Sequence, residues 1–145
     1  LARQLKLDVS QYGESVVRDP SAQVRRELAI ALRHSKSPMA TNLWVQLAQQ
    51  HDGKDRWYLE ALGIASDGHA DEYFAAWSKT VGDSWNTPAG RDIIWRSRAS
   101  DATDFLVKIL QDPDTPAEEH DHYLRAFDFH DGTKKEAALM SLLGL

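Results

Sequence analysis

The densest group of potential metal ligands in the chain is the run from Glu118 to His122, which contains only carboxylates and imidazoles. Zinc and related metals bind such groups, and two ligands share one face of a helix when they are three or four residues apart. His120 and His122 are two residues apart, whereas Glu118 and His122 satisfy the spacing. No third ligand element is identifiable, and acidic residues in the first turn of a helix complement its dipole. The sequence therefore predicts no metal site.

Acid–base catalysis is the second chemistry to consider, because the chain has six histidines and imidazole titrates near neutral pH. His34, His51 and His130 lie near expected helix ends, where a cation is favoured. No serine has a Gly-x-Ser-x-Gly context, and Asp52–Asp55 ("DGKD") does not complete a phosphate loop. Asp112–Pro116 ("DPDTP") is better interpreted as a turn between repeats than as a calcium loop. We expect no catalytic residue and no cofactor.

Tryptophan and arginine side chains point instead to a surface that binds another protein. Trp44, Trp57 and Trp77 occur at helical spacing and are expected in the core. Trp85 lies in the longest loop-like segment, Val81–Gly90, where it either fills a junction between repeats or contacts a partner. Tryptophan and arginine are frequent among the residues that dominate binding energy. The candidate partner contacts are Trp85, Arg91, Arg96 and Arg98.

The elements that would position these side chains are helices. Apolar residues recur at helical spacing, as in Ala40, Leu43, Trp44 and Leu47, and no segment alternates as a strand would. At four prolines we interpret the preceding Asp, Ser or Thr as an N-cap and the proline as the first helical residue. The expected fold class is all-α. Helix starts are expected at Asp19-Pro20, Ser37-Pro38, Thr87-Pro88 and Thr115-Pro116.

The helices repeat in pairs with a shared period of about 30–35 residues. One series, at intervals of 31, 35 and 30 residues, consists of Leu28, Leu59, Ile94 and Leu124. The partner series, at intervals of 30, 32 and 34 residues, consists of Leu43, Tyr73, Phe105 and Leu139. A helical hairpin cannot bury both of its apolar faces alone, so neighbouring hairpins stack. We predict a right-handed α-α superhelix, a HEAT/ARM-like solenoid of about four helical hairpins; a closed helical bundle is the alternative.

The predicted fold leads to expectations for particular side chains. Arg25 is expected to hydrogen-bond a turn carboxylate such as that of Asp19. Gly63 lies inside a helix, where glycine is unfavourable by roughly 1 kcal/mol relative to alanine, so we expect a neighbouring helix to approach closely there. The side chains expected in the core are Leu28, Leu32, Leu43, Leu47, Leu62, Phe74, Phe105, Ile109, Leu124 and Phe127.

Composition limits the possible partners. The 145 residues, 42% of them apolar and 27% charged, are expected to form a single domain spanning residues 1–145. The net charge of -5 argues against nucleic-acid binding, because that requires the protein to neutralise phosphates. No apolar run approaches a bilayer span, so we expect no membrane insertion by this segment. Cysteine is absent, and from the first residues we expect no signal peptide within this segment. We expect the chain to be a fragment of a larger protein.

The segment "DPSAQVRRELAIALRH", Asp19 to His34, resembles the first helix of a HEAT or PBS-type HEAT-like repeat. Such repeats often carry an Asp-Pro turn, a Val-Arg pair and core Leu and Ala residues, which are here Asp19-Pro20, Val24-Arg25, Leu28 and Ala29. The longer segment "HDGKDRWYLEALGIASDGHADEYFAAW", His51 to Trp77, resembles the HEAT-like part of planctomycete-type dehydrogenases that also contain a β-propeller and a c-type cytochrome domain. The resemblance implies a periplasmic or secreted location, with the haem outside this chain.

The expected function is therefore a non-catalytic helical-repeat scaffold that mediates protein–protein or inter-domain packing. Its partners would be proteins or neighbouring domains of the same chain, and not nucleic acid. The alternative is a structural module of a secreted haem-containing dehydrogenase-like protein, whose redox sites would lie outside this segment. Without the resemblance, the sequence leaves the location of the protein open.

Overall fold

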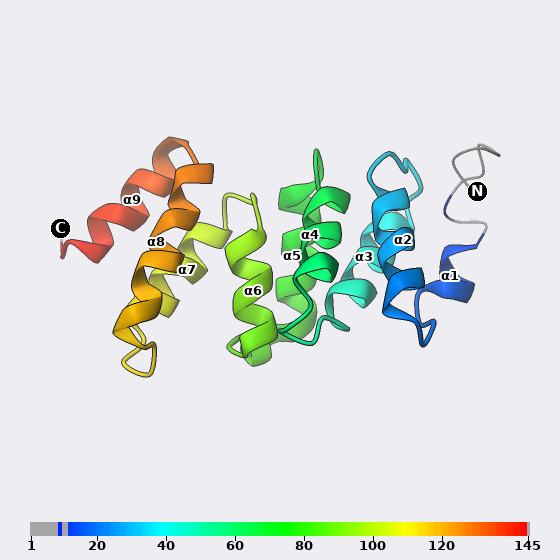
Figure 1. Cartoon of the computed structure of the whole chain (residues 1–145). Helices are drawn as coiled ribbons and strands as arrows, with labels where there is room; N and C mark the ends of the chain where they lie inside the picture. Colours follow the sequence, from blue (N-terminus) through cyan, green and yellow to red (C-terminus); the bar gives the residue numbers. More distant parts are fainter. Residues whose placement is uncertain (1–8, 10–11, 145) are drawn as a thin grey trace.

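The computed structural model describes residue 9 and residues 12–144, and within them the chain is helical without any β-strand (Figure 1). This confirms the all-α class. Short 3-10 helices connect some of the α-helices: η2 (Gly82–Trp85), η3 (Ala117–Glu119) and η4 (Phe127–Phe129). The α-helices are α1 (Gly13–Val16), α2 (Ala22–Leu32), α3 (Ala40–Ala48), α4 (Arg56–Ala65), α5 (Ala70–Val81), α6 (Pro88–Arg96), α7 (Ala102–Gln111), α8 (His120–Ala126) and α9 (Gly132–Leu142).

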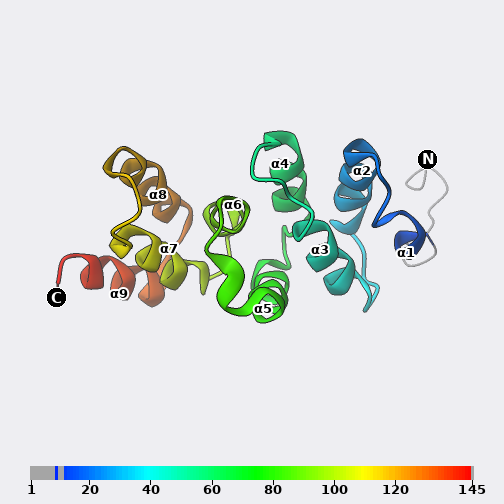
Figure 2. The same cartoon turned by 90° about the horizontal axis from the view of Figure 1, so that it is seen from below.

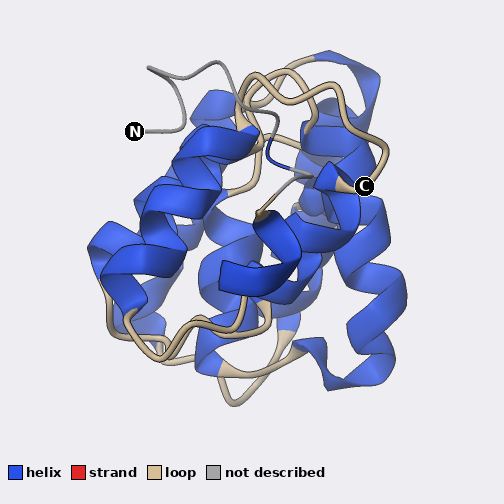
Figure 3. Ribbon diagram, turned by 90° about the vertical axis from the view of Figure 1, so that its right-hand side faces the viewer, coloured by secondary structure: helices blue, strands red, loops and turns tan. Residues whose placement is uncertain are grey.

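The helices pack mainly against the helix after next. The pairs are α2 with α4, α3 with α5, α4 with α6, α6 with α8 and α7 with α9. In Figure 1 the helices stand side by side, with α1 and α9 at opposite ends. Seen from below, α2, α4, α6 and α8 lie on one side and the odd-numbered helices on the other (Figure 2). Viewed from the α1 end, the helices superimpose with their connecting loops gathered at the edges of the view (Figure 3).

Side-chain caps set the starts of three helices. The side chains of Ser21, Asp55 and Thr87 accept hydrogen bonds from backbone amides in the first turns of α2, α4 and α6. Of the four proline pairs, only Thr87-Pro88 starts an α-helix as expected, with Pro88 as its first residue. The other three prolines precede their helices, because the chain makes a turn before the helix begins.

Most of the predicted core is confirmed, with two exceptions. Phe105 is only partly buried, and Leu124 is 42% exposed. Tyr123, Ala126 and Phe127 are the buried residues there, and their i, i+3, i+4 spacing places them on one face. The predicted core residues that are buried are Leu28, Leu32, Leu43, Leu47, Leu62, Phe74, Ile109 and Phe127.

The tryptophans also divide differently from the expectation. Trp44 and Trp77 are buried, but Trp57 is 72% exposed, so its predicted core role is wrong. The inner face of α4 is formed by Tyr58 and Leu59 together with residues one turn further on. Trp57 lies one residue before Tyr58 and therefore points away from that face. None of the described helices is both long enough and apolar enough to cross a membrane.

Candidate docking groove

A groove of about 580 Å³ opens beside the first turn of α6, next to the connection between α7 and α8. Most of its side chains are polar, and it includes Arg91, one of the four residues predicted to contact a partner. The lining residues are Gly53, Asn86, Thr87, Pro88, Arg91, Asp92, Asp112, Asp114, Pro116, Glu119, His122 and Tyr123.

Arg91 organises one wall of the groove. Its Nη2 lies 2.6 Å from Oδ2 of Asp112, Nη1 donates to Oγ1 of Thr115 at 2.8 Å, and Nε donates to Oδ1 of Asn86 at 2.7 Å. The arginine and the aspartate are both largely buried, with side-chain exposures of 14% and 19%. A planar guanidinium in several hydrogen bonds holds its partners in a fixed geometry. Arg91 therefore fixes the α7–α8 connection against the start of α6.

The turn at Asp112–Pro116 is shaped by its own side chains, as the sequence indicated. Oδ1 of Asp112 accepts from the backbone amide of Asp114 at 2.9 Å, and Oγ1 of Thr115 donates to the carbonyl of Ile109 at 2.7 Å. The Asp114 amide, followed by the Asn86 side chain and the Arg91 charge, lowers the pKa of Asp112 below its usual value. Asp112 is therefore held in its charged form. Thr115 is not the helix cap that its proline pair suggested.

On the α4 side, Asp92 pairs with a buried histidine. Nε2 of His51 lies 2.8 Å from Oδ2 of Asp92, and the imidazole stacks parallel to the Tyr58 ring at 6.1 Å. The His51 side chain is 1% exposed, and its Nδ1 is buried without a hydrogen-bond partner. A general base must reach the proton that it removes. The second nitrogen of His51 is enclosed by protein, so this pair is suited to joining the α3–α4 connection to α6.

An aromatic pair joins α6 to α8 beside the groove. The His122 imidazole stacks on the Trp95 ring with 4.5 Å between centroids and 15° between planes. Nε1 of Trp95 donates to the carbonyl of His122 at 3.1 Å. His122 remains exposed, whereas Tyr123 beneath it is buried. Burial, and then the charge of Glu119, raises the pKa of Tyr123 above its usual value.

The other three predicted contact residues occupy separate places. Trp85 lies in η2, not in an open loop, and packs edge-on against Phe105 with 5.2 Å between centroids. Arg98 donates to backbone carbonyls at the end of α6, including that of Arg96 at 3.0 Å, and lies 3.9 Å above the Phe129 ring. These contacts place the side chains within the fold, and only Arg91 lines the groove. That the four contact a partner stays a prediction.

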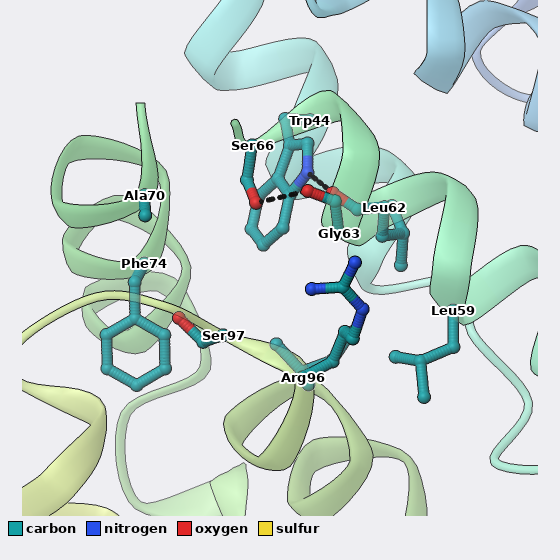
Figure 4. Close-up of a pocket in the computed structure, with 10 residues that line it drawn as sticks. Trp44, Leu59, Leu62, Gly63, Ser66, Ala70, Phe74, Arg96 and Ser97 are labelled. Atoms are coloured by element: carbon teal, nitrogen blue, oxygen red, sulfur yellow. Dashed lines mark hydrogen bonds between the residues drawn. The ribbon is translucent and has the colours of Figure 1, made fainter. Parts of the chain in front are cut away.

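Arg96 closes a small apolar cavity between α4, α5 and α6, whose volume of about 10 Å³ suits a single water molecule (Figure 4). Its Nε donates to Oε2 of Glu60 at 3.0 Å, and its guanidinium points toward Gly63. A Cβ atom at Gly63 would lie 2.3 Å from Cζ of Arg96. Gly63 is therefore closely approached, as predicted, but by the Arg96 side chain and not by the backbone of a neighbouring helix.

The run from Glu118 to His122 does not gather around one point. Glu118 and Glu119 lie in η3. His122 belongs to the following helix, α8, where its ring stacks on that of Trp95. Among the described residues, no three His, Asp or Glu side chains are placed to hold a metal ion.

Arg25 also differs from its expected role, because its Nη1 donates to the backbone carbonyl of Asp19 at 2.6 Å and not to the carboxylate.

Sequence reasoning missed the groove as a unit, although it singled out several of its parts. Asp112 was interpreted as part of a turn and His122 as a weak ligand candidate, and nothing linked them to Arg91. These residues are distant in sequence and meet only because α6 and α8 pack together. Comparison of the chain with family models, with curated proteins and with solved structures found no match. The resemblance to HEAT-like repeats therefore stays a prediction.

Proposed function

We propose that this chain is a non-catalytic helical-repeat scaffold, a HEAT/ARM-like solenoid that mediates protein–protein or inter-domain packing. The observation that carries this proposal is the packing of helices against the helix after next, in the pairs α2–α4, α3–α5, α4–α6, α6–α8 and α7–α9. Stacked helical hairpins pack in this way, and each layer covers the apolar face of the layer before it. Such stacks offer extended surfaces to partners.

The polar groove beside α6 is the surface that we assign to docking. Its volume of about 580 Å³ falls within the range of pockets that hold a small ligand or a few side chains. A bound segment would contact the first turn of α6 and the Asp112–Pro116 turn. Both are held by the Arg91 network, so binding would require little reordering of the chain.

The enclosed histidine supports a binding role over a catalytic one. His51 and Asp92 form the one histidine–carboxylate pair among the described residues, and the buried histidine offers no open nitrogen to a substrate. His122 is open, but its ring stacks on Trp95, and no carboxylate among the described residues pairs with it. A positioned base is normally oriented by a third group.

Site-specific photo-cross-linking tests the docking role. A benzophenone amino acid is placed at Asp114, which lines the groove, and at Lys79, an exposed residue of α5, as the matched control. In the cells that make the protein, we expect a discrete adduct from position 114 whose mass spectrum identifies one protein segment, and no such adduct from position 79. Equal adducts from both positions, or none from position 114, would count against the proposal.

A further inference from the structure

The charges in the groove are unequally matched. Asp92 and Asp112 are engaged with His51 and Arg91, respectively. The side chains of Asp114 and Glu119 also line the groove and are exposed, and they take part in none of the hydrogen bonds or ion pairs described above. Arg91, the cation in the lining, is already neutralised by Asp112. The groove therefore presents two uncompensated carboxylates to a ligand.

An aromatic surface lies next to these carboxylates. The exposed His122 imidazole is held flat against Trp95 and also meets the Tyr123 ring edge-on, with 5.2 Å between centroids. A guanidinium group can bond a carboxylate through its edge while its planar face stacks on a ring. A lysine ammonium, a compact and strongly hydrated charge, lacks the planar face. The combination of free carboxylates and a fixed ring favours arginine.

From these two features we propose that the groove binds an extended protein segment that carries arginine side chains. The inference rests on the proposed docking role and adds the chemistry of the partner. Charge complementarity supports it, because the free lining charges are negative and the whole chain carries -5. The groove volume of about 580 Å³ accommodates a few side chains and not a folded domain.

A fluorescein-labelled peptide of alternating arginine and glycine residues tests the proposal by fluorescence anisotropy at near-physiological salt. The variant D114K/E119K reverses the two free charges. The control E27K/E136K reverses two exposed carboxylates on α2 and α9, outside the groove lining. Each replacement adds two charges, so both variants change the net charge from -5 to -1 (-5 + 4). The pair separates binding in the groove from attraction to the overall charge.

We expect the peptide to bind the wild-type chain and the control with similar affinity, and D114K/E119K about tenfold or more weakly, because like charges now face the peptide. The milder variant D114N/E119Q guards against a folding defect and should weaken binding in the same direction. Equal losses in D114K/E119K and the control would overturn the proposal, as would a lysine–glycine peptide that binds as tightly as the arginine peptide. A groove cross-link to a segment without arginine would refute this inference and leave the docking role standing.

Discussion

Replacing Gly90 with alanine is a demanding test of how α6 is seated. Gly90 is the third residue of α6 and is buried. A Cβ atom there would lie 1.9 Å from the carbonyl oxygen of Trp85 and 2.9 Å from its carbonyl carbon. Real Cβ atoms do not approach backbone so closely, and neither atom belongs to a side chain that can turn away. The η2 turn or the first turn of α6 would have to move.

The expected magnitude follows from two opposing effects. Overpacking a well-filled site by a methyl group costs about 1–3 kcal/mol, and a backbone obstacle places Gly90→Ala at the upper end of that range. Alanine is the better helix former by about 1 kcal/mol, which offsets part of the loss. We therefore expect a net destabilisation of about 2 kcal/mol. Because Thr87 caps α6 through the amide of Gly90, the cap should be disturbed as well.

Urea unfolding followed by both tryptophan fluorescence and far-ultraviolet circular dichroism measures this effect. The variant should unfold at a lower urea midpoint with an unchanged slope, since the slope reports the surface exposed on unfolding. Gly68→Ala is not a suitable control, because Gly68 has a positive φ of 80°. Gly63→Ala is suitable, because the group that it meets is the flexible Arg96 side chain. A Gly90→Ala variant as stable as the wild type, or more stable, would refute the proposed seating of α6.

Three further predictions follow from burial and contact. Trp77→Ala should destabilise the chain by about 3–5 kcal/mol, because Trp77 is 2% exposed. Trp57→Ala should change stability by less than about 0.5 kcal/mol, because Trp57 is 72% exposed. Equal effects of the two changes in urea unfolding would contradict the structure. In a double-mutant cycle, Gly63→Ala should leave the free energy of unfolding nearly unchanged when Arg96 is present. In an Arg96→Ala background the same change should be stabilising by about 1 kcal/mol. Additive effects would show that the two residues are not in contact. Burial, and then the charges of Arg98 and Lys135, lower the pKa of His130 in the folded chain, against the opposing effect of Asp131. The unfolded chain therefore binds a proton at this histidine more readily than the folded chain does. The stability that neutral His130 contributes should be complete above about pH 6.5 and lost as the pH falls from there toward the folded-state pKa. The difference in urea midpoint between pH 7.5 and pH 5.5 should be smaller for His130→Gln than for the wild type, and an equal difference would refute the assignment.

The all-α class followed from the sequence because helical periodicity is a local property that each segment carries by itself. Leu43 and Leu47 lie four residues apart, and both are fully buried. The error at Leu124 was a choice one residue away from the buried face, since neighbouring side chains of a helix point about 100° apart and the adjacent Tyr123 is the buried one. Trp57 was misplaced because helical spacing was taken as evidence of burial, although the adjacent Tyr58 holds the inner position.

The groove depends on tertiary packing and was much harder to foresee. Arg91 is 21 residues before Asp112 and 24 residues before Thr115, and no local pattern pairs them. The sequence did mark Arg91 as a contact candidate and Asp112–Pro116 as a turn. It could not show that the hydrogen bonds of Arg91 are made within the fold, or that the unpaired charges beside it are the carboxylates of Asp114 and Glu119. Because of those two facts, the contact that we expect with a partner is no longer an arginine of this chain. It is a pair of carboxylates of this chain that bind an arginine of the partner.

The central claim is that the helices stand in a row, with α6 between the earlier and later pairs and a docking groove beside it. A two-dimensional nuclear Overhauser spectrum tests this directly, because it reports which rings lie close together. We predict cross-peaks between Trp95 and His122, between Trp85 and Phe105, and between Phe74 and Phe105. No cross-peaks are expected between α2 and α9, which lie at opposite ends of the row (Figure 1). Contacts between α2 or α3 and α8 or α9 would indicate a closed bundle and would contradict both the row and the groove.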